Sequence, residues 1–278
     1  MRTLALSLLA IAAIAALALG SMRLLDARAD RRVWLWLTAQ QPNRPLRFDP
    51  IMVTALPDPA RRFFNFSITR GTPLLTVTEI TMVGRFGLGT KDAPRYQAMQ
   101  AQQILAMPQG FLWTMRTRSG LPLSGSDAAH WTRFRILGLI PVARLGGTAD
   151  HTRSAFGRQV AEALFWTPAA LLPGPGISWQ AVDEDTARVT LTHGGLVQAV
   201  DLRVNAEGRP LQVAFQRWSD ANTDRTYRLQ PFGGYLSDFR EVQGFRIPFH
   251  VEAGNQFGTS DYFPFFVVDL TDVRFRSR

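Results

Sequence analysis

The feature that most constrains this chain is the alternation of apolar and polar residues between short turns rich in glycine and acidic residues. The stretch ISWQAVDEDTARVTLTHGG, residues 177–195, shows it clearly. Ala187, Val189 and Leu191 alternate with polar residues, an acidic turn precedes them, and a glycine pair follows. Because successive side chains of a β-strand point to opposite faces, this pattern predicts a strand with one apolar face. That face must cover a filled core, a bound apolar molecule or a catalytic cavity.

Comparable segments recur from residue 74 to the C-terminus, and they predict about ten strands joined mostly by hairpin turns. One helical pattern interrupts them over residues 152–172, where Phe156, Val160 and Leu164 form an apolar stripe. The combination predicts an α+β fold: a strongly curved antiparallel sheet, or half-barrel, with the helix on its concave face. We expect the apolar face of residues 187–191 to pack against this helix, because consecutive elements usually lie side by side.

Two local patterns add detail. Asp58 is expected to cap a short helix, and Asp150 or Thr152 is expected to cap the long one. Residues 130–147 are expected to begin as a strand and to continue as a loop or short helix, because a glycine and a proline interrupt the alternation there.

The N-terminal segment from Thr3 to Met22 contains no charged residue. As a helix it spans about 30 Å, which is one hydrocarbon thickness. Two interpretations are open, a cleaved signal peptide and an uncleaved anchor; the length favours the anchor, since a signal peptide core usually has ~7–15 residues. We therefore divide the chain into residues 1–22, a transmembrane anchor or signal segment; residues 23–50, a juxtamembrane helix and linker; and residues 51–278, a single globular domain with the curved sheet.

The charge and the absence of cysteine limit the possible partners. The formal net charge is +9 at pH 7, and Lys91 is the single lysine among the basic residues. The arginines are scattered over strands and turns, and no run of them resembles a nucleic-acid-binding arm, so no nucleic-acid partner is expected. Without cysteine the chain forms no disulfide, offers no thiolate to a metal, and lacks the attachment site of a lipoprotein.

No residue pattern points to catalysis. The four histidines are His130, His151, His193 and His250. None of them has the spacing of a metal-binding motif. Ser124 or Ser126 lies close to Asp127 and His130 in the sequence, but the G-x-S-x-G motif is absent and one short loop is a poor scaffold for a triad. We predict no catalytic residue, no metal site and no cofactor.

Several longer segments carry a family resemblance. They are, in order, LPDPARRFFNFSITRGTP, GRFGLG, GFLWTMRTRSGLPLSGSD, ALLPGPGISWQAVDEDTARVTLTHGG, YRLQPFGGYLSDFREVQGFRIPFHVEA and VVDLTDVRFRS. Together they resemble a bacterial family catalogued as a domain of unknown function, and the resemblance covers the chain from Leu56 to the C-terminus. The expected curved sheet with an inner helix also resembles the architecture of LolA/LolB and mycobacterial lipoprotein carriers. This second resemblance implies a location on the outer face of the membrane and a concave apolar surface.

The orientation of the chain is the point on which two signals disagree. Arg23, Arg28, Arg31 and Arg32 follow the apolar segment, and the positive-inside rule would keep the domain after them in the cytoplasm. The resemblance to envelope carriers implies the opposite side. We expect a single-pass inner-membrane protein with its domain on the outer, periplasmic face.

A half-closed sheet cannot fill its own interior, so some of the many aromatic residues are expected to line a cleft. We predict that Trp113, Trp131 and Phe249 bind a ligand near the open edge of the sheet. The leading hypothesis is a membrane-tethered envelope protein whose partners are the membrane and a lipid or other apolar ligand. Two alternatives stay open: a scaffold protein with a filled core, and a hydrolase or metal enzyme in which histidines converge with acidic residues.

Overall fold

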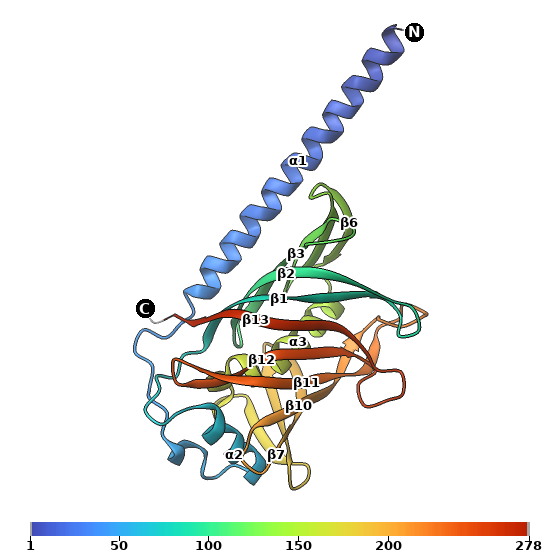
Figure 1. Cartoon of the computed structure of the whole chain (residues 1–278). Coiled ribbons are helices and arrows are strands. Elements are labelled where there is room, and N and C mark those ends of the chain that lie inside the picture. The colour runs from blue at the N-terminus through green and yellow to red at the C-terminus, as the bar shows by residue number, and fades with distance from the viewer. Residues whose placement is uncertain (1, 277–278) are drawn as a thin grey trace.

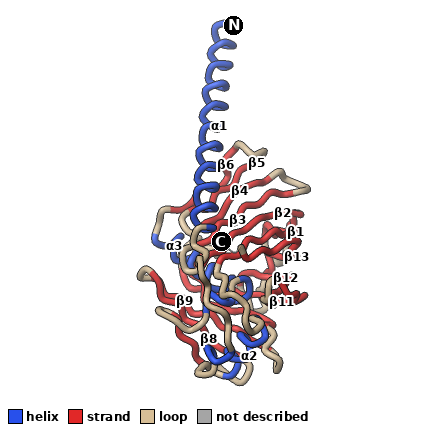
Figure 2. Tube along the Cα trace, turned by 90° about the vertical axis from the view of Figure 1, so that its left-hand side faces the viewer, coloured by secondary structure: helices blue, strands red, loops and turns tan. Residues whose placement is uncertain are grey.

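The computed structural model of the chain describes residues 2–276 (Figure 1). Helix α1 (Arg2–Thr38) projects from a domain that is built on one antiparallel sheet. The view in Figure 2 shows that only the C-terminal part of α1 lies beside this domain. Among the described helices, α1 alone is long and apolar enough to cross a membrane.

The sheet has thirteen strands, so the prediction of about ten was too low. The strands are β1 (Val77–Gly89), β2 (Pro94–Ala106), β3 (Gly110–Thr117), β4 (Leu123–Ala128), β5 (Trp131–Ile136), β6 (Ile140–Gly146), β7 (Ile177–Ala181), β8 (Thr186–His193), β9 (Leu196–Val204), β10 (Pro210–Ser219), β11 (Arg228–Val242), β12 (Phe245–Asn255) and β13 (Phe263–Phe275). Their order in space is β6-β5-β4-β3-β2-β1-β13-β12-β11-β10-β9-β8-β7, and the last strand pairs with the first, Val273 opposite Ile80. All neighbouring strands are thus consecutive in the chain except β1 and β13.

The β5–β6 hairpin corrects the expectation of a loop or short helix after residue 136. Leu137 and Gly138 both have positive φ, at 54° and 69°, and they form the tight turn that returns the chain along itself. Ile136 then lies opposite Ile140. The alternation is hard to recognise here because the register shifts between Phe134 and Arg135 and most of β6 is exposed on both faces.

Helix α3 (Ala149–Trp166) lies inside the curve of the sheet. It touches β6 at one edge, β2 and β3 further in, and β12, β10 and β9 towards the other edge. One helix can reach strands so far apart in the sheet only if the sheet bends around it. Gly157 permits the close approach, because a Cβ there would lie 2.8 Å from Gln198 Oε1 and 3.3 Å from the Phe215 ring.

The N-cap of α3 is Thr148, so the expected capping residues Asp150 and Thr152 were wrong. The Thr148 hydroxyl accepts a hydrogen bond from the backbone N–H of His151 (3.1 Å), which satisfies one of the free donors of the first turn. Asp150 instead accepts a hydrogen bond from Trp218 Nε1 (2.8 Å) and fastens the start of the helix to β10.

Helix α2 (Asp58–Ser67) covers the other end of the sheet. Its N-cap is Pro57, and Asp58 forms ion pairs with Arg61 and Arg62 rather than capping the helix. The Phe64 ring packs edge-on against Trp179 of β7 at 5.4 Å. Short 3-10 turns precede α2 at Pro50–Val53 and follow α3 at Pro168–Leu171.

The apolar face of β8 is buried as predicted, but its helical neighbour differs from the prediction. Ala187, Val189 and Leu191 are at most 3% exposed and belong to the main core. The helix that packs on β8 is α2, whereas α3 packs on β9 and β10. The curvature of the sheet explains the difference, because the end of the sheet with β7 and β8 lies beyond α3. This end is covered by α2, which precedes the sheet in the chain.

The C-terminal end of α1 docks on the convex face of the sheet. Leu37 is fully buried and packs with Ile104 of β2 and Leu112 of β3, which alternate with residues that face α3. Asp26, 4% exposed, forms ion pairs with arginines of the β5–β6 hairpin, namely Arg133, Arg135 and Arg144. Through these contacts the C-terminal part of α1 packs as an integral element of the domain.

Candidate functional site

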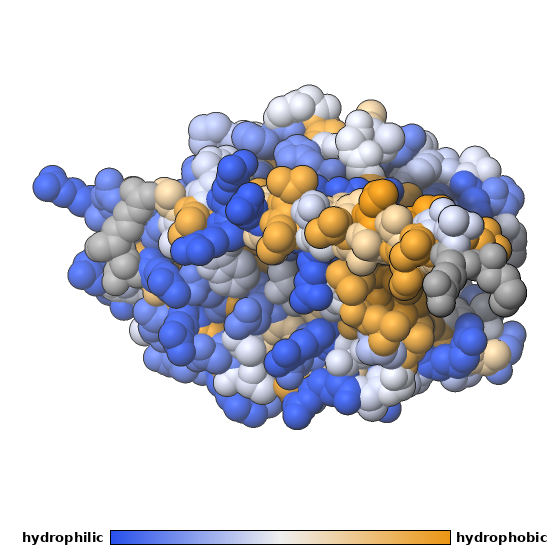
Figure 3. Space-filling model, turned by 90° about the horizontal axis from the view of Figure 1, so that it is seen from above, coloured by the Kyte–Doolittle hydropathy of each residue, from blue (hydrophilic) through white to orange (hydrophobic). Residues whose placement is uncertain are grey.

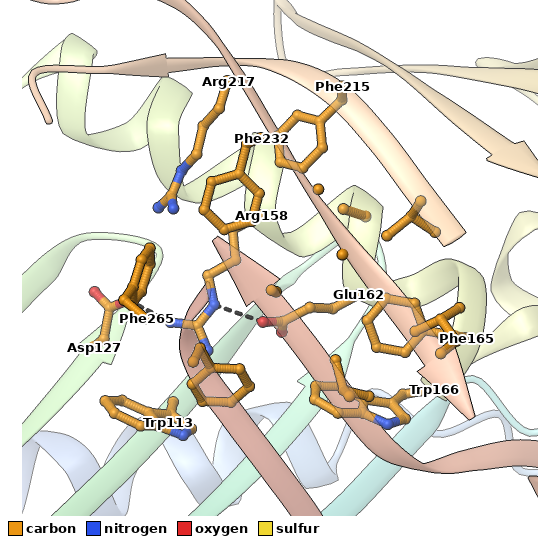
Figure 4. Close-up of a pocket in the computed structure, with 18 of the residues that line it drawn as sticks. Trp113, Asp127, Arg158, Glu162, Phe165, Trp166, Phe215, Arg217, Phe232 and Phe265 are labelled. Carbon is orange, nitrogen blue, oxygen red and sulfur yellow. Dashed lines mark hydrogen bonds and ion pairs between the residues drawn. The ribbon is translucent and has the colours of Figure 1, made fainter. Parts of the chain in front are cut away.

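A cavity of about 250 Å³ lies between α3 and the concave face of the sheet (Figure 4). Its wall is predominantly aromatic, with rings contributed by Phe86, Trp113, Phe134, Phe165, Trp166, Phe215, Phe232, Phe265 and Phe266. These rings come from α3 and from six strands that are distant in the sequence. The volume exceeds the ~150 Å³ of an engineered cavity that binds benzene and lies just below the ~300 Å³ at which ligand pockets usually begin.

The rings of the wall contact one another at the edges rather than filling the space. Trp113 of β3 has its ring centroid 6.5 Å from Phe86, 6.4 Å from Phe134 and 6.2 Å from Phe266. Those three phenylalanines are only partly buried. A strongly curved sheet with one inner helix leaves the space between them unfilled, and a pocket with aromatic walls of this kind can accept an apolar molecule.

A polar cluster occupies one side of the cavity, around Arg158 of α3. The Arg158 guanidinium donates to Asp127 Oδ2 (2.6 Å), to Glu162 Oε1 (2.7 Å) and to Gln103 Oε1 (3.1 Å). Gln103 in turn donates to Glu162 Oε2 (2.6 Å). Burial acts to lower the pKa of Arg158, but the two carboxylates outweigh it and raise that pKa. Every charge in this cluster has a direct partner.

A second arginine, Arg217 of β10, reaches the same cavity without such a partner. Its side chain forms no ion pair or hydrogen bond with any residue of 2–276, and its Nε is buried without an acceptor. Its guanidinium carbon lies 4.9 Å from the centroid of the Phe232 ring. Burial, and then the nearby positive charge of Arg158, lower the pKa of Arg217.

Thr132 and His151 adjoin the polar cluster but do not make a catalytic triad. The Thr132 hydroxyl donates to Asp127 Oδ1 (2.5 Å) and lies 3.0 Å from His151 Nε2. Because the hydroxyl proton goes to the carboxylate, it is not directed at His151, and the three side chains lack the proton path of a triad. His151 Nδ1 has no partner, and burial lowers the pKa of His151.

The three residues predicted from the sequence are separated in the structure. Trp113 lines the cavity. Trp131 lies near α1, where it donates to Ser126 Oγ (3.1 Å) and packs beneath Arg133. Phe249 is buried in the core, with the Arg240 guanidinium over its ring. Within residues 2–276, no group of three His, Asp or Glu side chains is placed to hold a metal ion.

The polar residues of the cavity were missed by sequence reasoning, although one signal was present. Val213, Phe215 and Arg217 alternate along β10 and share its inward face, so the arginine sits where an apolar residue is expected. Arg158 and Glu162 have the spacing of four residues that is also typical of an ion pair on an exposed helix face. Only their burial distinguishes them from such a pair.

Comparison with known proteins gives the family. The model of a family of unknown function, DUF6544, matches residues 47–268. The chain belongs to the DUF6544 family. This membership confirms the resemblance that the sequence segments showed, and no curated protein matches this DUF6544 chain.

Solved structures with a similar outline are distant. A LolA superfamily protein from Nitrosomonas europaea is 13% identical, with a TM-score of 0.43 over 79% of the DUF6544 chain and 93% of its own. A putative outer membrane lipoprotein-sorting protein domain from Vibrio parahaemolyticus is 12% identical, with a TM-score of 0.37 over 72% and 85%. A DUF1329 family protein from Desulfovibrio piger is 9% identical, with a TM-score of 0.41 over 78% and 90%.

Proposed function

We propose that this protein is a membrane-tethered envelope protein that binds a lipid or another apolar ligand in the cavity between α3 and the sheet. The observation that carries the proposal is the aromatic cavity of about 250 Å³ itself. Burial of apolar surface contributes about 25 cal/mol per Å², so a wall of this kind favours an apolar guest over water. The alternative of a scaffold protein with a filled core predicts no such cavity.

The size of the cavity restricts the guest. A volume of about 250 Å³ accepts a medium-length chain or the end of a longer one, rather than a whole lipid with two chains. Trp113 is the residue predicted from the sequence that lies in the right place for this contact. We assign no ligand-binding role to Trp131 or Phe249, because neither lines this cavity.

The tether in this proposal is α1, whose uncharged stretch Thr3–Met22 would span the membrane and whose C-terminal part is docked on the domain. The domain is placed on the outer face of the inner membrane, in line with the carrier architecture that the sequence resembles. The arginines that follow the span oppose this placement, and a topology measurement that separates the two is given in the Discussion.

Native mass spectrometry of the detergent-extracted full chain tests the binding. We expect a bound apolar species that survives extraction, or one that is taken up when medium-chain lipids are added. The Ala253→Phe variant places a ring in the cavity from β12 and should lose the bound species while keeping a similar melting temperature. Ala206→Phe, at an exposed turn, is the matched control. Absence of any uptake by the unmodified chain would contradict the proposal.

A further inference from the structure

Arg217 stands out because its partly exposed side chain lines the cavity beside the Phe232 ring without an ion-pair partner among residues 2–276. The alternation of β10 turns its side chain inward with Val213 and Phe215. An arginine keeps its proton at neutral pH, so this side chain remains a cation. Its Nε is buried without an acceptor among the described residues, whereas buried donors of charged groups are normally paired.

The acidic residues of the cavity do not form an ion pair with Arg217. Asp127 and Glu162 both bind Arg158 directly, and Asp127 also accepts from Thr132. Two arginines and two carboxylates balance formally, but all the direct contacts go to one of the arginines. Figure 4 shows Arg217 on one side of the cavity, with Phe165 and Trp166 on the opposite side. The cavity therefore has one end with a free cation and one end with only rings.

We infer that the cavity takes a single-chain amphiphile with an anionic head group, carboxylate or phosphate, whose oxygens pair with Arg217 while the chain lies against the rings. This inference rests on the proposed function and specifies the chemical class of the ligand. The planar guanidinium matches both head groups, since it can donate two parallel hydrogen bonds to either. A neutral alcohol of the same length would leave the cation unpaired.

The test is a titration of the full chain in neutral maltoside micelles, with quenching of tryptophan fluorescence as the readout, since Trp113 and Trp166 line the cavity. The probes are decanoate, decyl phosphate, decanol and inorganic phosphate. We expect both anionic chains to bind at least about tenfold more tightly than decanol, the ratio that one charged hydrogen bond supplies. Inorganic phosphate alone should not bind in the same range. Arg217→Gln should remove the preference, so that the variant binds decanoate and decanol with similar affinity.

The outcomes separate this inference from the proposed function. Equal binding of decanoate and decanol, or a preference retained in Arg217→Gln, overturns the anionic head group but leaves apolar binding in place. Failure of every chain to bind overturns the proposed function as well. Inorganic phosphate that binds as tightly as decyl phosphate would mean a free-anion site. Arg203→Gln changes an exposed arginine of β9 and is the matched control, which should keep the preference for anionic chains. Arg217→Lys should keep part of that preference.

A separate observation concerns the tip of the β5–β6 hairpin. Its exposed apolar side chains are Leu137, Leu139 and Ile140, and Val142 and Leu145 continue the exposed apolar side chains along β6. The tip stands beside α1 at the level of Arg23, whose guanidinium would lie 2.8 Å from a Cβ at Gly138. Arg23 is the first charged residue after the apolar span. Figure 3 views the molecule from the end at which α1 projects, and it shows apolar side chains gathered over part of this face.

We propose that this hairpin tip inserts into the headgroup and acyl boundary of the bilayer that α1 spans. Exposed apolar patches of this kind mark interaction sites, and this one adjoins a segment that is itself of membrane-spanning composition. The two anchors would hold the domain at a fixed tilt against the membrane.

The absence of native cysteine makes this proposal simple to test. An environment-sensitive fluorophore is attached to one of two variants, Ile140→Cys on the tip or Val197→Cys on β9. The native Ile140 and Val197 side chains are 51% and 59% exposed. The full chain is reconstituted in phosphatidylglycerol/phosphatidylethanolamine nanodiscs that contain spin-labelled lipid. The label at 140 should shift to the blue and be quenched several-fold more than the label at 197. Equal quenching at the two positions would overturn the insertion.

Discussion

Arg158 is the single residue on which the polar side of the cavity depends. Its partners Asp127 and Glu162 have side chains only 17% and 11% exposed, so removal of the guanidinium leaves two largely buried carboxylates without a positively charged partner. Arg158→Met keeps the apolar stem but no charge. We expect it to lower the free energy of unfolding by about 3–5 kcal/mol, the cost of breaking a buried pair, in chemical denaturation at pH 7.

Arg188→Met is the matched control for this prediction. Arg188 also pairs with a carboxylate, Asp201, but their side chains are 44% and 29% exposed. Exposed ion pairs contribute about 1 kcal/mol or less. If the two variants lost similar stability, the cluster around Arg158 would not be the buried network described above.

His151 gives the molecule a specific pH dependence. Burial lowers the pKa of His151 below its usual value of 6.5, so the unfolded chain takes up this proton first as the pH falls. Neutral His151 therefore makes its full contribution to stability above about pH 6.5. This contribution decreases as the pH falls from 6.5 to the pKa of His151 in the folded state. The melting temperature should fall more steeply between pH 7 and 5 in the native chain than in His151→Asn. Parallel curves for the two proteins would contradict this assignment.

Among the elements, β8 is the one whose role in packing can be separated from ligand binding. Leu191 is 3% exposed and does not line the cavity. Leu191→Ala should reduce the free energy of unfolding by about 2–5 kcal/mol, through lost burial and the space left behind. Ligand binding, measured in the fluorescence titration at a temperature where the variant is folded, should not change.

The neighbouring Thr192→Ala is the control for that change. Thr192 is on the exposed face of the same strand, so its stability should stay within about 0.5 kcal/mol of the native chain. A Leu191→Ala variant that melted like the native protein but bound ligand more weakly would place the cleft at β8 instead.

At the scale of the elements, the alternating pattern predicted the hairpins and the buried face of β8, and the stripe on residues 152–172 predicted α3. It did not predict β6 or the helix that covers β8. A period of two identifies which side of a strand is apolar, but it does not say how far the sheet bends, and the bend decides which helix lies opposite. The caps were missed for a similar reason, because Thr148, Asp150 and Thr152 are chemically equivalent until the start of the helix is known.

At the scale of the whole molecule, orientation in the membrane decides where a ligand comes from. A reporter fused after Arg278 distinguishes the two sides. With the domain on the outer face, an alkaline phosphatase fusion should be active, and a fluorescent protein that matures only in the cytoplasm should stay dark. The reverse pattern would show that the arginines after the span determine the topology, as the positive-inside rule predicts.

The sequence by itself determined the class of the fold, the apolar span at the N-terminus and the inward or outward side of most strand residues, because these depend on local periodicity and composition. Only the tertiary structure decided the cavity. Trp113, Arg158 and Arg217 belong to a strand, a helix and another strand, and they meet because the sheet curls around α3 and β1 pairs with β13. Which arginine has a carboxylate partner and which has none also depends on that curvature, since ion pairs form between neighbours in space and leave no periodic signal in the chain.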